Sequence, residues 1–460
     1  MSLIVSISGI RGTIGGEVSA NLTPLDIVKF SSAYATWLIK NSESKPKVVV
    51  GRDARISGAM VNQLVIASLT AMGIDVVDLG LSTTPTVELA VTDEQASGGI
   101  IITASHNPKE WNALKLLNSS GEFISEKDGE SIKKIAEKGV FNYATVDKLG
   151  TVTEDHDYIK KHIDKILQLS LVDVEAIKAK NYKIVIDCVN STGGIALPPL
   201  LYALGVKEVV ELYCTPNGHF PHNPEPLPQN LSQIASDVKF HKAHLGIVVD
   251  PDVDRLCFIN DDGDFFGEEY TLVAIADYVL KHKKGSTVSN LSSTWALRDV
   301  TLKNGCKYFT SAVGEVNVVK EMKKQKAVIG GEGNGGIIYP ELHYGRDAMV
   351  GIALFLSHLA QSGKNSSILR SSYSNYYMSK SKIELTNDID LDKIIEGIKE
   401  KYKKQNLITI DGLKIEFENE WVHLRRSNTE PIIRIYTESQ SQSTSDFLAK
   451  KIMEDIKALM

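Results

Sequence analysis

Cysteine is scarce in this sequence, with four residues among 460 and no CxxC pair. They lie far apart, at Cys188, Cys214, Cys257 and Cys306. Their number and spacing exclude a dense disulfide framework and a cysteine-based zinc site. The sequence therefore fits a protein of the reducing cytoplasm.

The chain also lacks a long apolar run and a basic block. No stretch approaches the roughly 18 apolar residues of a membrane span, and the first residues do not resemble a secretion signal. The formal net charge is -6, and no clustered Lys and Arg provide a footprint for nucleic acid. We expect no membrane or nucleic-acid partner, and a small phosphate ligand if any. The chain is expected to act as a monomer or homodimer.

Length and pattern together predict several domains. A chain of 460 residues exceeds the size at which a single core keeps growing. Short β-rich runs alternate three times with segments of helical length, which is typical of α/β units with parallel or mixed sheets. After about residue 369 the pattern changes to that of an antiparallel α+β module. We predict three consecutive α/β domains and a C-terminal α+β domain around a central interdomain cleft, with bounds 1–150, 151–255, 256–369 and 370–460.

Three predicted strands end directly in polar loops. Strand 99–103 leads into the segment ASHNP, strand 245–250 into a charged loop, and strand 327–330 into GEGNGG. Open α/β sheets bind ligands at the carboxyl ends of their strands. Loops from three domains are therefore expected to converge on one site.

The segment DPDVDR, residues 250–255, is the most informative of these loops. In an extended chain, side chains two residues apart point the same way, which gathers the carboxylates of Asp250, Asp252 and Asp254. The calcium-loop pattern fails at two positions, so Mg²⁺ is the better choice of cation. The alternative is a solvated acidic turn, although such a turn explains neither the apolar strand before it nor Arg255, which suits a phosphate on the metal.

The segment TASHNPKEWNALK, residues 103–115, places Ser105 at a strand end with His106 beside it and Lys115 downstream. No GxSxG elbow surrounds the serine, which disfavours acyl transfer. Considered alone, SHNP is a turn formed by Asn and Pro.

The segment RRSNTEP, residues 425–431, offers a cradle for phosphate. Arg425 has a planar fork of donors, and Ser427, Asn428 and Thr429 add hydroxyl, amide and backbone donors. The alternative is an Asn-containing turn between two strands. In GEGNGG the glycines permit a tight turn, and Glu332 is able to accept hydrogen bonds from sugar hydroxyls.

These segments, taken in order, resemble those of the α-D-phosphohexomutase family, which includes phosphoglucomutases, phosphomannomutases and phosphoglucosamine mutases. GIRG at 9–12 and VGRDARISG at 50–58 resemble its first-domain signatures, and TASHNP resembles its phosphoserine loop. DPDVDR resembles its metal loop, GEGNGG its sugar loop and RSNTEP its phosphate loop. The similarity spans nearly the whole chain.

The resemblance implies roles for individual residues. Ser105 would carry the phosphoryl group and, with the three aspartates, hold Mg²⁺. The transferring phosphate would be surrounded by Arg11, His106, Lys115 and Arg255, with Lys115 a candidate for proton transfer. The sugar and its second phosphate would be bound by Glu332, Asn334, Arg346, Arg425, Ser427, Asn428 and Thr429. A hexose 1,6-bisphosphate would serve as intermediate and activator.

Two segments depart from the family pattern. The sugar loop commonly reads Gly-Glu-x-Ser-Gly, whereas Asn334 stands here in place of the serine. The segment HYGRDA, residues 343–348, also differs from the bacterial phosphomannomutase forms, and within it Arg346 is expected to reach the ligand. We favour glucosamine 6-phosphate as substrate. The alternatives are a mannose or glucose phosphate and, in another class, a non-catalytic protein that binds sugar phosphates.

Overall fold

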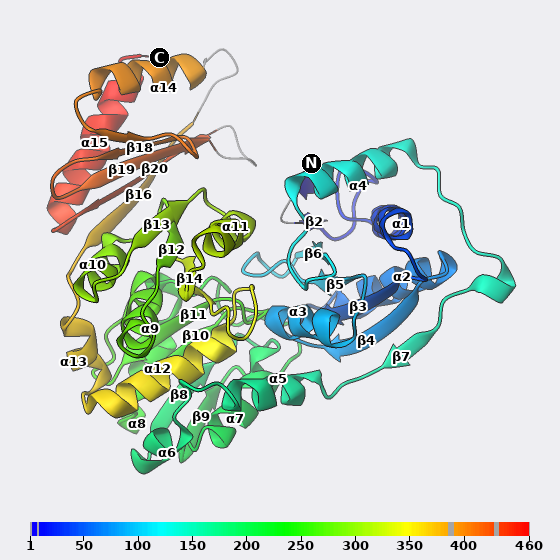
Figure 1. The fold of residues 1–460 in the computed structure, drawn as a ribbon, viewed down its shortest axis with the longest axis horizontal. Coiled ribbons are helices and arrows are strands. Elements are labelled where there is room, and N and C mark those ends of the chain that lie inside the picture. The colour runs from blue at the N-terminus through cyan, green and yellow to red at the C-terminus, as the bar shows by residue number, and fades with distance from the viewer. Residues whose placement is uncertain (1, 7–8, 385–390, 427–431, 460) are drawn as a thin grey trace.

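The computed structural model describes residues 2–6, 9–384, 391–426 and 432–459 of the chain. Four β-sheets follow one another along the sequence, each with its own helices (Figure 1). The first three units are α/β and the last is α+β, which confirms the predicted fold class.

The first unit is a seven-stranded mixed sheet in the order β1-β2-β6-β5-β3-β4-β7. Helices α1, α2 and α4 pack against one face of this sheet and α3 packs against the other. Helix α1 begins at the predicted cap, where the Thr23 side chain accepts from the backbone N–H of Asp26. The elements are β1 (Ile4–Ser6), β2 (Gly9–Thr13), α1 (Pro24–Asn41), β3 (Lys47–Arg52), α2 (Gly58–Ala71), β4 (Asp75–Leu81), α3 (Thr84–Asp93), β5 (Gly98–Ile102), β6 (Trp111–Leu117), α4 (Glu126–Lys138) and β7 (Val152–Glu154).

The second unit has a four-stranded sheet in the order β11-β10-β8-β9. Strands β8, β9 and β10 are parallel, and β11 returns antiparallel to β10. The elements are α5 (Tyr158–Leu167), α6 (Val174–Ala179), β8 (Lys183–Asp187), α7 (Gly193–Ala203), β9 (Glu208–Leu212), α8 (Ser232–His241), β10 (Leu245–Val249) and β11 (Leu256–Asn260).

The third unit has the sheet order β13-β12-β14-β15. Its helices α9 and α12 belong to the same apolar cluster as strands β8 and β10, so the second and third units share one core. Within this core the rings of Phe258 and Phe355 stack with centroids 3.9 Å apart. The elements are α9 (Glu268–His282), β12 (Thr287–Asn290), α10 (Trp295–Lys303), β13 (Tyr308–Ser311), α11 (Glu315–Gln325), β14 (Ile329–Glu332), β15 (Gly336–Ile338), α12 (Ala348–Ser362) and α13 (Ser366–Ser371).

The fourth unit is an antiparallel sheet in the order β16-β20-β19-β18-β17, with α14 and α15 packed on one face (Figure 1). Trp421 on β19 is fully buried and donates to Glu438 on β20. The elements are β16 (Tyr377–Glu384), α14 (Leu391–Lys401), β17 (Asn406–Ile408), β18 (Leu413–Glu416), β19 (Trp421–Arg426), β20 (Ile432–Ser439) and α15 (Gln442–Lys457).

The polar loops of the first two units follow β5 and β10, as the sequence predicts, and β14 ends at Glu332 itself. The carboxyl ends of strands in three different sheets thus carry the candidate side chains. In the part of the chain that the structure describes, no helix has both the length and the apolar character needed to cross a bilayer.

Candidate functional site

Three carboxylates meet in the loop after β10. Asp250, Asp252 and Asp254 are fully buried, and one oxygen of each lies within 4.8 Å of the others. The expected cause of this gathering, alternation along an extended chain, is wrong. The loop is a turn in which Val253 has a left-handed φ of 62°, and the backbone N–H groups of Asp254 and Arg255 both donate to Asp250 Oδ1.

Burial of three neighbouring acids is unfavourable, and cations from two other units offset it. Lys115 Nζ lies 2.7 Å from Asp252 Oδ2 and 3.4 Å from an oxygen of Asp254. Arg346 Nη2 lies 2.6 Å from Asp254 Oδ2. The hydroxyl of Thr84 adds a hydrogen bond of 2.6 Å to Asp252. Lys115 and Thr84 belong to the first unit and Arg346 to the third, so the carboxylates join three units.

The pKa values of Asp250 and Lys115 reflect the balance between burial and the neighbouring charges. Burial, and then the charges of Asp254 and Asp252, raise the pKa of Asp250 well above its usual range. Burial opposes the charge of Lys115, but the carboxylates of Asp252 and Asp254 outweigh it and raise the pKa of Lys115. Lys115 is therefore an ammonium at neutral pH.

The carboxylate cluster fits a hard divalent cation. Asp252 Oδ1 and Asp254 Oδ1 are buried and have no hydrogen-bond partner among the described residues. Such oxygens normally have a partner, and a cation would provide one. All three side chains offer oxygen only, which suits Mg²⁺ better than a softer metal.

Ser105 lies beside the cluster, in the loop that follows β5. Its hydroxyl donates to Asp250 Oδ2 over 2.7 Å, and its Oγ is 3.3 Å from Nδ1 of His106. Burial, followed by the charge of Arg255, lowers the pKa of His106 well below its usual value. The imidazole is therefore neutral at pH 7 and does not add a positive charge beside the serine.

The backbone of Ser105 is held in a strained conformation by Arg55. Ser105 has a φ of 48°, in the left-handed region that non-glycine residues rarely adopt. Arg55 is fully buried and pairs with Asp53 over 3.0 Å, and Asp53 in turn accepts from the hydroxyl of Thr103 over 2.6 Å. The guanidinium of Arg55 donates over 2.5 to 2.9 Å to the carbonyl oxygens of Ser105, Asn107, Pro108 and Trp111. The segment 50–58 stands out in the sequence, but no pattern within it indicates this role of Arg55.

The third unit reaches the carboxylates through Arg346. Besides Asp254, its guanidinium contacts Glu332 Oε2 over 3.1 Å and Glu315 Oε2 over 3.0 Å. Glu332 Oε1 also accepts from the amide of Asn290 over 2.8 Å. The predicted residues Arg346 and Glu332 are thus brought into one network with the metal loop. Nothing in the sequence pattern pointed to Glu315.

A second buried cluster fixes the chain next to Arg346. Asp347 Oδ2 lies 2.9 Å from His162 Nε2 and 3.2 Å from His343 Nε2. His343 Nδ1 is 3.3 Å from Glu88 on α3. Burial raises the pKa of Glu88 to about 8. Burial opposes protonation of His343, but the hydrogen bond that it donates to Asp347 and the neighbouring carboxylate of Glu88 raise its pKa to about 10. These contacts tie the segment 343–348 to the first unit through Glu88 and to the second unit through His162.

Four further predicted residues that the structure describes are Arg11, Arg255, Asn334 and Arg425. Arg11 is on β2 opposite Ala113 of β6, and burial lowers its pKa. Arg255 Nη1 lies 3.5 Å from Glu225. Asn334 Oδ1 accepts from a backbone N–H of its own loop. Arg425 pairs with Asp411 over 2.8 Å, whereas Ser427, Asn428 and Thr429 lie outside the described residues.

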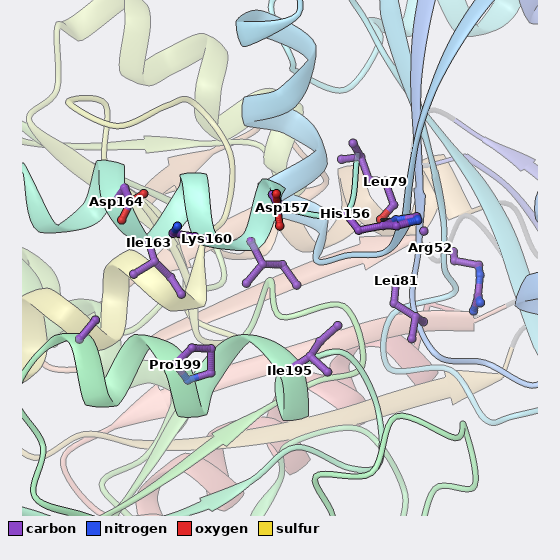
Figure 2. Close-up of a pocket in the computed structure, with 13 residues that line it drawn as sticks. Arg52, Leu79, Leu81, His156, Asp157, Lys160, Ile163, Asp164, Ile195 and Pro199 are labelled. Atoms are coloured by element: carbon purple, nitrogen blue, oxygen red, sulfur yellow. Dashed lines mark hydrogen bonds between the residues drawn. The ribbon is translucent and has the colours of Figure 1, made fainter. Parts of the chain in front are cut away.

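A cavity of about 770 Å³ lies at another place, between β4, α5 and α7. Figure 2 shows Ile163 of α5 above Pro199 and Ile195 of α7, with Arg52 at one end. None of the predicted site residues that the structure describes lines this cavity. The chemistry indicated by the carboxylates is therefore not located there.

Comparison with protein families gives four matches that cover most of the chain. The matching models are the phosphoglucomutase/phosphomannomutase alpha/beta/alpha domains I, II and III and the C-terminal domain of the same proteins. They match residues 3–143, 160–263, 267–376 and 382–455, respectively.

Individual proteins are similar over nearly their full length. The phosphoglucomutase/phosphomannomutase of Thermococcus kodakarensis is 36% identical, covering 94% of each chain. The phosphoglucosamine/phosphogalactosamine mutase of Sulfurisphaera tokodaii is 33% identical, covering 99% of this chain and 100% of that protein. The crystal structure of a putative phosphomannomutase from Thermus thermophilus superimposes with a TM-score of 0.83 at 25% identity, covering 99% of this chain and 100% of that chain.

We predict that Arg55→Met lowers the free energy of unfolding by about 3–5 kcal/mol, because it leaves the carboxylate of Asp53 buried without its cation. Lys47→Met is the matched control, since it breaks the more exposed pair with Glu94 and should cost at most about 1 kcal/mol. Urea unfolding followed by tryptophan fluorescence measures both losses. Equal losses in the two variants would contradict the role given to Arg55.

We also predict that Mg²⁺ raises the unfolding temperature of the protein, because a ligand that binds only the folded state adds about 2.7 kcal/mol at a concentration 100 times its Kd. Asp252→Asn should remove most of this Mg²⁺-dependent shift. Asp262→Asn, in an exposed turn, should keep it. Thermal unfolding with EDTA or with Mg²⁺ makes the comparison, and the same shift in both variants would exclude the cluster as the metal site.

Proposed function

This chain belongs to the phosphoglucomutase/phosphomannomutase family, and on that basis we propose that it interconverts hexose 6-phosphate and hexose 1-phosphate through phosphorylated Ser105. The chain is an enzyme, a phosphohexose mutase. The observation that supports the proposed mechanism best is the hydrogen bond of 2.7 Å between the Ser105 hydroxyl and Asp250 in the buried carboxylate cluster. This contact supports the proposal because the hydroxyl that would carry the phosphoryl group lies next to the carboxylates that would hold Mg²⁺.

The proposed reaction moves a phosphoryl group twice. In the first transfer the bond between phosphorus and the Ser105 oxygen breaks, and a bond forms between phosphorus and the free hydroxyl of the sugar monophosphate. The hexose 1,6-bisphosphate turns end for end, and its other phosphoryl group returns to Ser105. Transfer of this kind needs alignment and charge neutralisation more than covalent chemistry from the protein.

The charged groups around Ser105 suit these requirements. Asp250, Asp252 and Asp254 would hold Mg²⁺, which supplies charge neutralisation at the phosphate when it is bound. Lys115 is protonated and lies at the cluster, so it offers a cation and a proton to the serine oxygen that leaves. The neutral imidazole of His106 provides a hydrogen-bonding partner at Ser105 Oγ.

The proposal assigns the remaining predicted residues to the phosphates and the sugar. Arg11 and Arg255 would bind the transferring phosphate, and Arg425 with residues 427–429 would bind the phosphate that does not react. Glu332, Asn334 and Arg346 would contact the sugar. The unit bounds 1–150, 151–255, 256–369 and 370–460, the bisphosphate activator, a cytoplasmic location and a monomeric or dimeric state also stay predictions.

For the substrate we propose glucosamine 6-phosphate. The protonated amine at C2 of this sugar is a hydrogen-bond donor that needs an acceptor. Asn334 offers the carbonyl oxygen of its amide as an acceptor, at the position where the family commonly has serine. The relative from Sulfurisphaera tokodaii bears the name of a glucosamine phosphate mutase, which supports the choice. Mannose or glucose phosphate is the second candidate, because the relative from Thermococcus kodakarensis is named for those sugars.

We predict that Ser105→Ala lowers kcat by about 1000-fold or more, since the variant has no oxygen to carry the phosphoryl group. Binding of hexose phosphate, measured by calorimetry, should remain. Ser120→Ala removes an exposed hydroxyl of the same unit and should leave kcat unchanged. In the wild type, mass spectrometry should find one phosphoryl group on the peptide that contains Ser105. Near-normal turnover by Ser105→Ala would rule out the covalent scheme.

We predict that kcat/KM is highest for glucosamine 6-phosphate when glucosamine, mannose and glucose phosphates are assayed in parallel with catalytic bisphosphate. Asn334→Ser restores the common loop sequence and should lower the preference for glucosamine about 10-fold, the usual value of one polar contact. A higher kcat/KM for the mannose or glucose phosphate would reject the proposed substrate and leave the mutase chemistry intact.

A further inference from the structure

Two of the four cysteines lie at the ends of neighbouring parallel strands. In the register of β8 and β9, Asp187 pairs with Leu212, and these are the last residues of their strands. Cys188 follows the first strand directly, and Cys214 stands two residues after the second. Neighbouring strands are about 5 Å apart, so the backbones are close enough for a disulfide, which needs Cα atoms about 4.4–6.8 Å apart.

The backbone of Tyr213 turns Cys214 towards Cys188. Cys188 belongs to the apolar cluster shared by the second and third units. Leu212 faces the cluster on the opposite side of the sheet, and strict alternation would place Cys214 there too. Tyr213 has a left-handed φ of 52°, which breaks the alternation. Cys214 consequently packs against the same cluster as Cys188.

The packing around Gly193 and Gly194 brings the two cysteines together. A Cβ atom on Gly193 would lie 3.2 Å from Cys188 Sγ, and one on Gly194 would lie 2.0 Å from the carbonyl oxygen of Cys214. The absence of side chains at these two positions lets both cysteines approach the start of α7. The Sγ atom of Cys214 lies 3.3 Å from the carbonyl oxygen of Leu212, which also accepts from the backbone N–H of Cys188, so the side chain of Cys214 turns back towards the neighbouring strand end.

The other two cysteines do not share this arrangement. Cys257 is buried on β11 in the cluster on the opposite face of the sheet. Cys306 is half-buried in the third unit, after α10. Cys188 is fully buried, whereas Cys214 is half-buried. Cys214 is therefore the residue of the pair that keeps some surface exposed to solvent.

We propose that Cys188 and Cys214 form a reversible disulfide in the folded protein, with a small disulfide such as glutathione disulfide as the oxidant. The Cys214 thiolate attacks one sulfur of the oxidant, which forms a mixed disulfide and releases one glutathione thiolate. The Cys188 thiolate then attacks the Cys214 sulfur and displaces the second glutathione. Two protein thiols are oxidised, one disulfide is reduced to two thiols, and the two protons lost by the cysteines end on glutathione.

The disulfide would act on the turn that supports the carboxylate loop. Ser191 and Thr192, which directly precede α7, both donate from their hydroxyls to the carbonyl oxygen of Pro251, over 2.7 and 2.8 Å. Ser191 Oγ also accepts from the backbone N–H of Ala54 over 3.3 Å. Cys188 is three residues before Ser191, and its carbonyl accepts from the N–H of Ser191. A link at Cys188 therefore fixes the base of a turn that touches both the metal loop and the segment 53–55.

The test is peptide mapping of the full-length protein after oxidation. Reduced protein is treated with glutathione disulfide in native buffer, its free thiols are alkylated, and it is digested without reduction. We expect one disulfide that joins the peptides of Cys188 and Cys214, with both thiols lost from the alkylated pool. A link that forms only after denaturation, or a link that involves Cys257 or Cys306, would overturn the proposal.

Single substitutions separate the two steps. Cys188→Ala should leave Cys214 as a stable mixed disulfide with glutathione, because no second thiol resolves it. Cys214→Ser should leave Cys188 unmodified, because the buried thiol does not meet the oxidant. Cys306→Ser is the control and should form the same link as the wild type. Oxidation of Cys188 by glutathione in the Cys214→Ser variant would contradict the order of attack, and wild type that stops at the mixed disulfide would contradict the link itself.

Discussion

The burial of three carboxylates at one point is the constraint on which the rest of the site depends. Asp250, Asp252 and Asp254 have no exposed surface, and charges of like sign at this separation repel strongly in a medium of low polarity. Two cations compensate this repulsion, Lys115 from β6 and Arg346 from the segment before α12. Because these cations come from different units, the electrostatics of the cluster also determine how the first three units are joined.

The sequence predicted much of this arrangement for identifiable reasons. Apolar strands such as 245–249 and 98–102 stand out by composition, and a polar loop directly after such a strand has a defined place in an α/β sheet. The proximity of Ser105 to the three aspartates was therefore expected from the sequence alone. The cause of their gathering was not expected, because the left-handed turn at Val253 contains no glycine, the residue that usually marks such a turn in a sequence. A non-glycine residue with a positive φ leaves no signal in the hydrophobic periodicity of a sequence.

Residues that reach the site only through contacts between distant parts of the chain could not be predicted from the sequence. Thr84 meets Asp252 across 168 positions, and Glu315 meets Arg346 from the start of α11. No local pattern marks such a pair, since its partners come together only when elements distant in the sequence pack against each other. The segment 425–431 is a different case, because its sequence resembles a phosphate loop. Arg425 lies on β19 and pairs with Asp411, which also accepts from the backbone N–H of Val313 in the third unit. The fourth unit thus contacts the third unit beside Gly314, whose N–H donates to Glu332.

The bracing of Ser105 has a consequence for protein engineering. A single guanidinium, that of Arg55, fastens four carbonyl groups of the loop, and its own position depends on Asp53. The loop that carries Ser105 therefore depends on residues that lie outside it in the sequence. If residues 103–111 are transplanted into another scaffold, residues 53–55 must be transplanted with them in the same spatial relation. Without Arg55 and Asp53, the backbone of Ser105 will relax to an ordinary geometry, and its hydroxyl will point in another direction.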